Sequence, residues 1–435
     1  QDYVVTVADK ASSNFVFICK HYYLNVLCSE LNFLNNSNST TYKVNNNFEH
    51  ATVNRNLKDL LIPTTSNKIT ITESLPFMYW IPKLHKNPYK SRFITSAKNC
   101  SNTLLSKLVT EGLKIIRTFY KNYCNVIYRN SRINKFWSIN NTYDFIDKLV
   151  SIHKIKSIST FDFSTLYTSL PQDLLIESAK TLLEKPFTKN NFLITNCFNT
   201  YWSNNSTCPK SYYCFDKITF FESIKFLVNN SYITFGSKVF HQVIGIPMGS
   251  NFSPLLADLF IFNCEYNFVN SLNINDSYAF RNITRYIDDL AVINFPNFHT
   301  YIGKIYPQSL EVSSTSHPDN IHYLDLNVNI THPVNFTVFD KRDDFNFTII
   351  NYPHYTSNIP VQIQKGVFTS QLHRLLRLNS NHQSFQNRFK ILVDKFLTRK
   401  YPVTFLKHIF TKFHALHNES RFFDGSCFNQ CKFPY

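Results

Sequence analysis

The chain has 435 residues, of which 43% are hydrophobic, and 45 Lys and Arg residues outnumber 29 Asp and Glu residues to give a formal net charge of +16. This length and hydrophobic content exclude an intrinsically disordered chain and predict two or three compact units with a real core. The basic balance favours a polyanionic partner but does not indicate what sequence that partner has.

The sequence also bears on membrane insertion and compartment. It contains no run of eighteen apolar residues, so we expect no membrane span, no membrane partner and a soluble chain. Its ten cysteines form no CxxC pair, which is typical of a reduced, intracellular protein. The chain begins at Gln1 without a methionine, so we expect a longer reading frame with further domains upstream or downstream.

The first 75 residues are predicted to form an N-terminal extension. Apolar runs at residues 3–7 and 15–19, on either side of Asp9-Lys10, predict strands, and a break around Pro63 comes before Pro76. The next segment, residues 77–95, reads as two extended pieces with a basic connection. Its cations either hold a triphosphate or line a solvated hairpin; they are Lys83, Lys86, Lys90 and Arg92.

Two further stretches place special residues beside regular structure. Helical spacing covers residues 102–123, and Asp162 then ends an apolar run, so it should emerge at the edge of a strand. An Asp at such a position is also typical of a helix cap or turn. Gly245 and Gly249 precede the helical stretch 255–268, where a ligand-facing loop and a simple turn before the helix both stay open.

The sequence around Asp288-Asp289 predicts a hairpin tip. Apolar and aromatic residues lead into and out of the two acids, as expected for two short strands joined by a tight turn. Two crowded carboxylates repel each other unless a cation lies between them, and Mg²⁺ prefers oxygen ligands and substrate phosphates. The pattern therefore favours phosphoryl transfer, although a surface Asp-Asp turn is a common alternative.

The C-terminal region is amphipathic and basic. Residues 361–421 contain eleven Lys or Arg against Asp394 and Glu419, and their apolar residues fall on helical faces. We expect the cations on these helices to face nucleic-acid phosphates; the predicted contacts are Arg374, Arg377, Arg388, Lys390 and Lys395.

Four stretches in this order resemble the motifs of reverse transcriptases, in particular those of Penelope-like retroelements, which are related to telomerase reverse transcriptase. They are Pro82-Lys83 through Arg92-Phe93-Ile94, Phe161-Asp162-Phe163-Ser164-Thr165-Leu166-Tyr167, Gly245-Ile246-Pro247-Met248-Gly249-Ser250 and Tyr286-Ile287-Asp288-Asp289. The later stretches 323–326, 339–342 and 370–374 are similar to the late palm and thumb of that family. Met248 stands where many reverse transcriptases have Gln; the retroelement branch resembles this chain in having Met there.

The resemblance implies an α+β right-hand polymerase with an antiparallel palm sheet. Fingers and palm would occupy residues 76–350, and a helical thumb with a C-terminal tail would occupy residues 351–435. Asp162, Asp288 and Asp289 would be catalytic and would hold two Mg²⁺ ions, for which Mn²⁺ can substitute, together with the backbone carbonyl of Phe163.

The same resemblance assigns nucleotide binding to five residues: Lys83, Arg92, Tyr167, Met248 and Gly249. Lys83 and Arg92 would clamp phosphates. Tyr167 would stack under the incoming sugar and exclude a 2′-hydroxyl, although a tyrosine of the palm core is the alternative. The general acid for the leaving pyrophosphate is left unassigned.

The implied function is RNA-directed DNA synthesis by a retroelement enzyme that uses an RNA template, a DNA primer and deoxynucleoside triphosphates. Such an enzyme acts in the nucleus and carries other domains of the same element. Two alternatives stay open: a telomerase-like or intron-type polymerase, and a catalytically retired retroelement protein that only binds nucleic acid.

Overall fold

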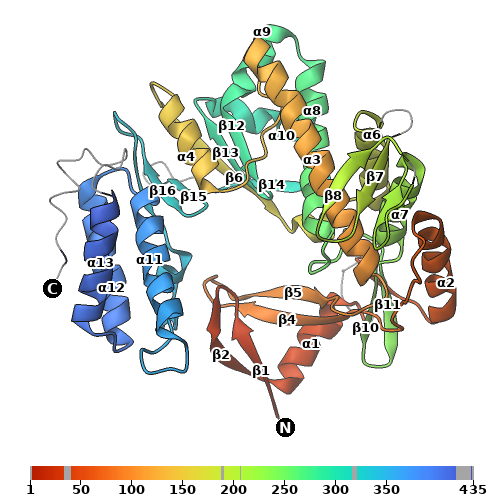
Figure 1. Ribbon diagram of the computed structural model, residues 1–435, viewed down its shortest axis with the longest axis horizontal. Helices are drawn as coiled ribbons and strands as arrows, with labels where there is room; N and C mark the ends of the chain where they lie inside the picture. The colour runs from red at the N-terminus through yellow and green to blue at the C-terminus, as the bar shows by residue number, and fades with distance from the viewer. Residues whose placement is uncertain are drawn as a thin grey trace.

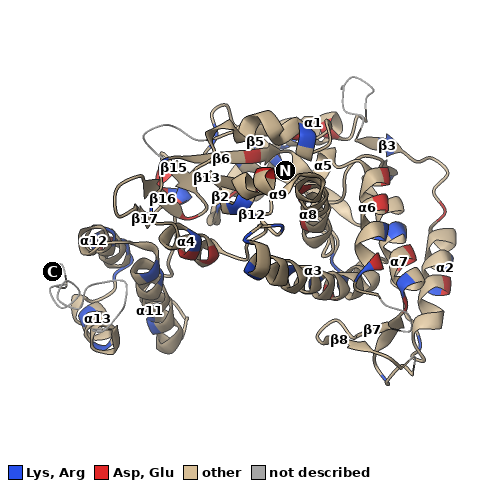
Figure 2. Cartoon of the chain, turned by 90° about the horizontal axis from the view of Figure 1, so that it is seen from above, with Lys and Arg blue, Asp and Glu red and all other residues tan. Residues whose placement is uncertain are grey.

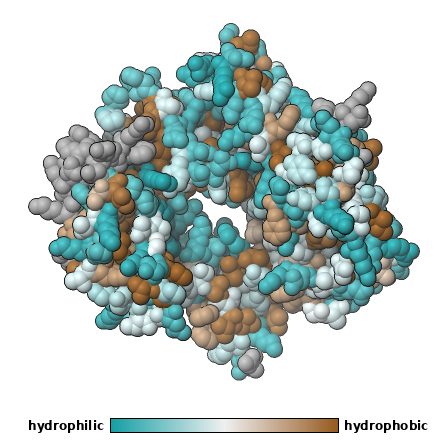
Figure 3. All heavy atoms as spheres, viewed as in Figure 1, coloured by the Kyte–Doolittle hydropathy of each residue, from teal (hydrophilic) through white to brown (hydrophobic). Residues whose placement is uncertain are grey.

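The computed structural model describes residues 2–33, 41–187, 191–205, 207–315, 321–417 and 433. Its helices and strands form an α+β fold, as the sequence predicts. They surround a central opening, with the C-terminal helices on the left and the N-terminal strands at the bottom of the view (Figures 1 and 3). None of the described helices is long and apolar enough to cross a membrane.

The N-terminal region begins with the two predicted strands. They are β1 (Tyr3–Ala8) and β2 (Ala11–Cys19), which form an antiparallel hairpin and lead into α1 (Lys20–Glu30). Tyr23 of α1 stacks on Trp80, and the Trp80 indole donates a hydrogen bond of 3.1 Å to the Tyr23 carbonyl. Aromatic packing thus attaches the extension to the strand that contains Trp80.

A five-stranded sheet joins three parts of the sequence, with the strand order β3-β11-β10-β4-β5. Its first strand lies within the predicted extension, and the two extended pieces predicted between residues 77 and 95 form the β4–β5 hairpin. The strands are β3 (Tyr42–Val44), β4 (Phe77–Lys83), β5 (Lys90–Ser96), β10 (Tyr232–Phe235) and β11 (Lys238–Gln242); α2 (His50–Leu61) and the short η1 (Ile62–Thr64) follow β3 in the chain.

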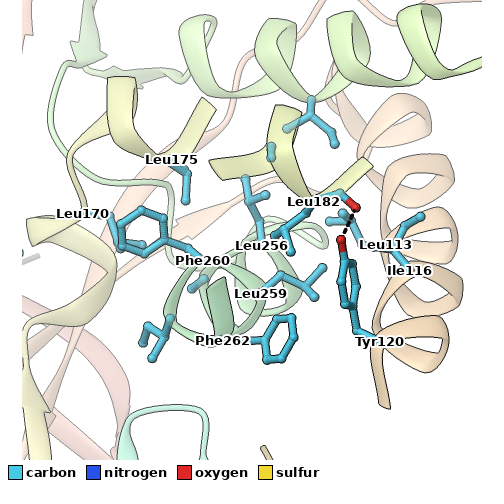
Figure 4. Close-up of a cluster of buried hydrophobic side chains, with 14 of the residues drawn as sticks. Leu113, Ile116, Tyr120, Leu170, Leu175, Leu182, Leu256, Leu259, Phe260 and Phe262 are labelled. Atoms are coloured by element: carbon cyan, nitrogen blue, oxygen red, sulfur yellow. Dashed lines mark hydrogen bonds between the residues drawn. The ribbon is translucent and has the colours of Figure 1, made fainter. Parts of the chain in front are cut away.

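A four-stranded antiparallel sheet, called the central sheet below, has the strand order β12-β13-β6-β14. Its strands are β6 (Ile158–Ser164), β12 (Ile283–Tyr286), β13 (Asp289–Ile293) and β14 (Glu311–Ser314). One face contributes to the largest core, which long helices complete; these are α3 (Thr103–Ser131), α6 (Gln172–Glu184), α7 (Lys217–Asn229) and α8 (Ser253–Ser271). Figure 4 shows part of this core, where the Tyr120 hydroxyl donates to the Leu182 carbonyl over 3.0 Å.

The segments around the sheet are short. They comprise α4 (Thr142–Ser151), α5 (Leu166–Ser169), α9 (Ile274–Ser277), η2 (Tyr278–Asn282), η3 (Pro296–Tyr301) and α10 (Ile302–Ile305). A three-stranded sheet, β8-β7-β9, follows α6 and packs on α3; its strands are β7 (Phe192–Thr195), β8 (Thr200–Ser203) and β9 (Tyr213–Phe215). Gly112 of α3 allows this packing, because a Cβ there would lie 2.7 Å from Leu193 and 2.3 Å from Phe220.

The C-terminal part has its own core, which also includes residues on the other face of the central sheet. It consists of β15 (Ile321–Tyr323), β16 (Leu326–Asn329), β17 (Asn335–Val338), η4 (Lys341–Asp344), α11 (Val361–Leu378), α12 (His382–Thr398) and α13 (Val403–His417). The apolar faces predicted for α11 and α12 are confirmed by the burial of Leu372, Leu375, Leu376, Phe385, Phe389, Leu392 and Phe396. The tail after residue 417 lies outside the described residues except for Phe433.

Candidate active site

The two acids of the hairpin lie at a tight turn, as predicted. Strands β12 and β13 pair in antiparallel register with Tyr286 opposite Asp289, so Ile287 and Asp288 form the turn. Ile287 has a φ of 55°, a left-handed conformation that tight hairpin turns commonly require. The turn is tied to the neighbouring strand, because the Phe163 amide donates to the Asp288 carbonyl over 3.2 Å.

Asp162 lies beside this hairpin, again as predicted. Strand β6 pairs with β13 so that Asp162 is directly opposite Asp289, and residues paired in this way point to the same face of a sheet. Phe161, Phe163 and Leu290 point to the opposite face and are buried in the largest core. The alternation of the strands therefore fixes which side of the sheet carries the two carboxylates.

The electrostatics show that the three acids interact. Burial raises the pKa of Asp289 to about 6, and the carboxylate of Asp288 contributes further. Burial and then Asp288 also raise the pKa of Asp162. Of the cations that act to lower these two pKa values, Lys341 has the largest effect on both. The ionised carboxylates thus repel one another and would be stabilised by a cation.

A buried arginine that the sequence reasoning missed supports the hairpin. Arg285 is fully buried and donates to Glu265 over 2.6 Å, to Asp258 over 2.7 Å and to the Ile287 carbonyl over 2.9 Å. Burial acts to raise the pKa of Asp258, but Arg285 and Arg117 together hold it below its ordinary value. The available signal was that the only two charged residues of α8 are acids seven residues apart, which places them on one side of the helix.

The glycine loop before α8 is held by backbone contacts. The Thr95 amide donates to the Met248 carbonyl over 2.7 Å, and the Ile246 amide donates to the Tyr167 carbonyl over 2.7 Å. A Cβ at Gly249, whose φ is 125°, would lie 2.1 Å from the Thr95 oxygen, and one at Gly245 would lie 2.2 Å from the Tyr167 oxygen. Both glycines are therefore required by close approach to the protein's own backbone.

The predicted phosphate-binding residues lie on the β4–β5 hairpin, next to an acid from the N-terminal hairpin. Arg92 forms an ion pair of 3.2 Å with Asp9, whose amide donates to the Pro82 carbonyl over 2.9 Å. The Nε of Arg92 and the Oδ2 of Asp9 are buried without a hydrogen-bond partner among the described residues. Burial and then Arg92 lower the pKa of Lys83.

Two cations without an assigned role in the sequence reasoning lie close to these groups. Burial, followed by the charge of Lys341, lowers the pKa of Lys10. Lys341 and Lys10 both act to lower the pKa of Asp289, against the effect of burial. Lys10 lies in the turn between β1 and β2, and Lys341 lies in η4. Lys341 belongs to the stretch 339–342, which is similar to a motif of the family, and this similarity was the signal available in the sequence.

Tyr167 lies in α5, shortly after β6, and is partly buried against the largest core. Burial raises its pKa to about 12, and Asp288 is the next contributor. The residue thus lies near the hairpin acids and also packs on the core, so its position is compatible with both roles that the sequence left open.

The basic residues of the C-terminal helices have different surroundings. Arg388 and Lys395 of α12 each lie 3.0 Å from Asp343, and Arg374 of α11 lies 3.4 Å from Asp325. Arg377 lies over the ring of Tyr143, and Lys390 is exposed to solvent. Figure 2 shows Lys and Arg along these helices. Phosphate binding by the five residues stays a prediction, and acids of this chain already neutralise three of them.

The metal prediction can be compared with this geometry. The described residues contain no group of three His, Cys, Asp or Glu side chains that is already arranged around an ion position. The donor set nevertheless fits a hard cation: Asp162 and Asp289 share one sheet face, Asp288 is adjacent, and burial, followed by the charge of Asp288, raises the pKa values of Asp162 and Asp289.

The fold is shared with solved telomerase structures. The chain aligns with telomerase from Candida albicans in complex with a TWJ fragment of telomeric RNA over 99% of its own length and 70% of that chain, at 13% identity and a TM-score of 0.58. Apo telomerase from Candida tropicalis gives 12% identity and a TM-score of 0.51 over 95% and 66% of the two chains. The chain has a telomerase-like fold.

At such low identity the likeness concerns the fold alone, so the part of the sequence prediction that it confirms is a telomerase-like α+β fold. The Penelope-like assignment stays a prediction. Residues 351–411, which include α11 and α12, match the family model of the animal helix-turn-helix domain. No curated protein matches the chain at the sequence level.

Proposed function

We propose that this chain is a nucleic-acid polymerase, specifically an RNA-directed DNA polymerase of the Penelope-like retroelement type. The observation that carries the proposal is the placement of Asp162 opposite Asp289, with Asp288 at the adjoining turn. The central sheet would be the palm, the β4–β5 hairpin part of the fingers, and α11 to α13 the thumb. The enzyme would act in the nucleus.

The three acids would hold two Mg²⁺ ions, or Mn²⁺, with the Phe163 carbonyl as a further ligand. When bound, such ions activate the primer 3′-hydroxyl as a nucleophile and neutralise the triphosphate and the leaving group. The chain's own contribution is to fix the carboxylates. Strand register sets Asp162 against Asp289, and Arg285 holds the Ile287 carbonyl at the turn.

The triphosphate would lie between the acids and the cations that face them. Arg92 has a buried Nε–H without a partner among the described residues, which is what a donor reserved for a phosphate would show. Lys83 would add a second phosphate contact, and Lys10 and Lys341 flank the acids from two other elements. Met248 and Gly249, attached to β5 through Thr95, would pack against the incoming nucleotide.

A template–primer duplex would occupy the central opening that Figure 3 shows. The C-terminal helices border this opening in Figure 1, and Arg374 and Arg377 line a cavity of about 520 Å³ together with Tyr143 of α4. Asp325 lines the same cavity and pairs with Arg374, so Arg377 is the cation of this wall that would contact a phosphate of the duplex.

Primer extension on RNA and DNA templates, with Mg²⁺ or Mn²⁺, tests the proposal. The wild-type chain should incorporate deoxynucleotides on RNA, whereas Asp162→Asn and Asp288→Asn should abolish extension and keep template–primer binding within a fewfold. Asp147→Asn, which changes an exposed acid of α4, is the matched control and should extend normally.

Each contrary outcome selects one alternative. Extension by both site variants would refute the metal assignment, and binding without extension by the wild type would favour a retired nucleic-acid-binding protein. Activity confined to DNA templates, or ribonucleotide products, would refute RNA-directed DNA synthesis.

A further inference from the structure

A groove follows α3 from the catalytic hairpin to the β7–β8 turn. At one end, a cavity of about 410 Å³ is lined by Tyr286 and Ile287 of the hairpin and by Lys114 and Arg117 of α3. A second cavity, of about 710 Å³, is lined by Lys107 and Lys114 of α3 and by Phe198. Because both cavities include Lys114, they adjoin on the same helix and form a path that starts at the candidate active site.

The far end of this α3 groove carries an exposed aromatic ring on a hydrogen-bonded turn. Phe198 is 92% exposed at the turn between β7 and β8. The Asn196 side-chain oxygen accepts from the amides of Phe198 and Asn199 over 3.1 and 2.9 Å, and the hydroxyls of Thr195 and Thr200 are 2.7 Å apart across the strands. These contacts hold the turn, so the ring is presented to solvent by a well-bonded hairpin.

The groove keeps its position because the hairpin is packed against α3. Gly112 lets β7 approach so closely that a Cβ would lie 2.7 Å from Leu193. Lys107 and Glu111 of α3 are near enough to Cys197, in the turn itself, to influence its pKa, although burial is the largest cause of the raised value. The aromatic ring and the lysines therefore belong to one surface.

The lining has the chemistry of a single-stranded nucleic-acid site. Lys107 and Lys114 are exposed, and the one acid lining the second cavity is Glu111, 2.6 Å from Lys114. The side-chain amides of Asn99 and Asn251 line it as well, and neither has a hydrogen-bond partner among the residues that the structure describes. Amides can read base edges, lysines bind phosphates, and an aromatic ring stacks on a base.

A duplex does not expose the faces of its bases, so a stacking ring selects a single strand. A lone exposed apolar residue is ordinary on a protein surface, but here it adjoins cations and free amides. A protein partner would instead favour a larger apolar patch.

We propose that the α3 groove binds the single-stranded part of the template ahead of the catalytic hairpin, with Phe198 stacked on one of its bases. Asn251 lies two residues after Gly249 of the glycine loop, so the groove is continuous with the predicted nucleotide site. That the strand is a template rests on the proposed function; that the groove takes a single strand rests on its lining.

Equilibrium binding to two duplexes tests this inference. Both have the same base-paired part, but one is blunt and the other carries a template overhang of about eight nucleotides, made in RNA and in DNA, which is within the usual span of a single-strand site. Fluorescence anisotropy is measured with Asp288→Asn in every protein, so that no extension occurs. We expect Phe198→Ala to weaken binding of the overhang duplex by at least about fivefold and to leave the blunt duplex unchanged.

Two further variants sharpen the test. Phe17→Ala removes a ring that is 70% exposed on β2 and should change neither affinity. Lys107→Gln should lower the salt dependence of overhang binding by roughly one unit on a log–log scale. Crosslinking of 4-thiouridine in the overhang should map to residues 196–199.

The contrary results are separable. Equal effects of Phe198→Ala on both duplexes, or no effect on either, would overturn the inference, as would a Phe198-dependent self-association of the chain, which would show a protein interface. Overhang-dependent binding by a wild-type chain that does not extend primers would refute the polymerase proposal and leave the groove intact. Primer extension by the wild type, combined with equal binding of the blunt and the overhang duplex, would refute the groove alone.

Discussion

Replacement of Arg285 by Met should destabilise the protein strongly, although Arg285 lies on the opposite face of the sheet from Asp162 and Asp289. The change leaves the side-chain volume similar but removes the hydrogen bonds of 2.6 Å to Glu265 and 2.7 Å to Asp258. Asp258 keeps Arg117 at 2.8 Å, whereas Glu265 keeps only the Tyr306 hydroxyl at 3.0 Å among its hydrogen-bond partners in the described chain. Removing one partner of a buried ion pair costs about 3–5 kcal/mol, and we expect this loss in the free energy of unfolding.

The loss in free energy of unfolding caused by Arg285→Met should increase as the pH rises. Burial raises the pKa of Glu265 even in the presence of Arg285. Without Arg285 the carboxyl should bind a proton more readily still, so the penalty for keeping it ionised should grow as the pH rises and shrink as the pH falls. Extension should also decline, because the Ile287 carbonyl loses the donor that holds the turn next to Asp288.

Urea denaturation of a small set of variants measures these effects. The double variant Arg285→Met with Glu265→Met should recover most of the loss, because a buried ion pair can often be replaced by apolar side chains without cost. Arg281→Met makes the same chemical change at an exposed position and should stay within about 0.5 kcal/mol of the wild type. A loss below about 1 kcal/mol for Arg285→Met, or no recovery in the double variant, would refute this reasoning.

Three further predictions concern the site and the duplex. Because folding raises the pKa of Asp289 from 3.8 to about 6, the ionised carboxylate destabilises the metal-free protein above pH 6, and this destabilisation disappears as the pH falls toward 4. The melting temperature of Asp289→Asn should lack that pH dependence. Stabilisation of the wild type by Mg²⁺ should weaken below pH 6. Tyr167→Ala should raise ribonucleotide over deoxynucleotide incorporation by about tenfold if the ring is a sugar gate, whereas parallel loss of both activities and of the melting temperature would show a core residue. Neutralising Arg377 and Lys390, which are exposed, should weaken the binding of all duplex sequences alike. The slope of log binding constant against log salt concentration should fall by roughly one unit for each lost phosphate contact. An unchanged slope would show that both residues are ordinary surface cations.

Local pattern was sufficient to predict the elements that carry the candidate site. Apolar runs that flank Asp288-Asp289 and precede Asp162 predicted a hairpin and a strand, and both are present because side-chain alternation and turn preference act over a few residues. Asp162 was predicted at the end of that strand but lies within β6, which continues to Ser164 because it also pairs with β14. Helical spacing likewise predicted the region of α3, which begins at Thr103 but continues to Ser131, beyond the predicted end. The apolar faces of α11 and α12 were predicted for the same reason.

The sequence by itself thus determined the strand and the hairpin that carry Asp162, Asp288 and Asp289, the helical regions of α3, α8, α11 and α12, and the identity of the acids, because these depend on short-range periodicity and chemistry. The tertiary structure decided which distant residues meet. It placed Arg285 between Asp258 and Glu265 and packed Gly249 against the Thr95 oxygen. It also paired Asp343 with Arg388 and Lys395 in ion pairs. Such contacts depend on how helices and sheets pack and on strand register between remote segments, and spacing along the chain encodes neither.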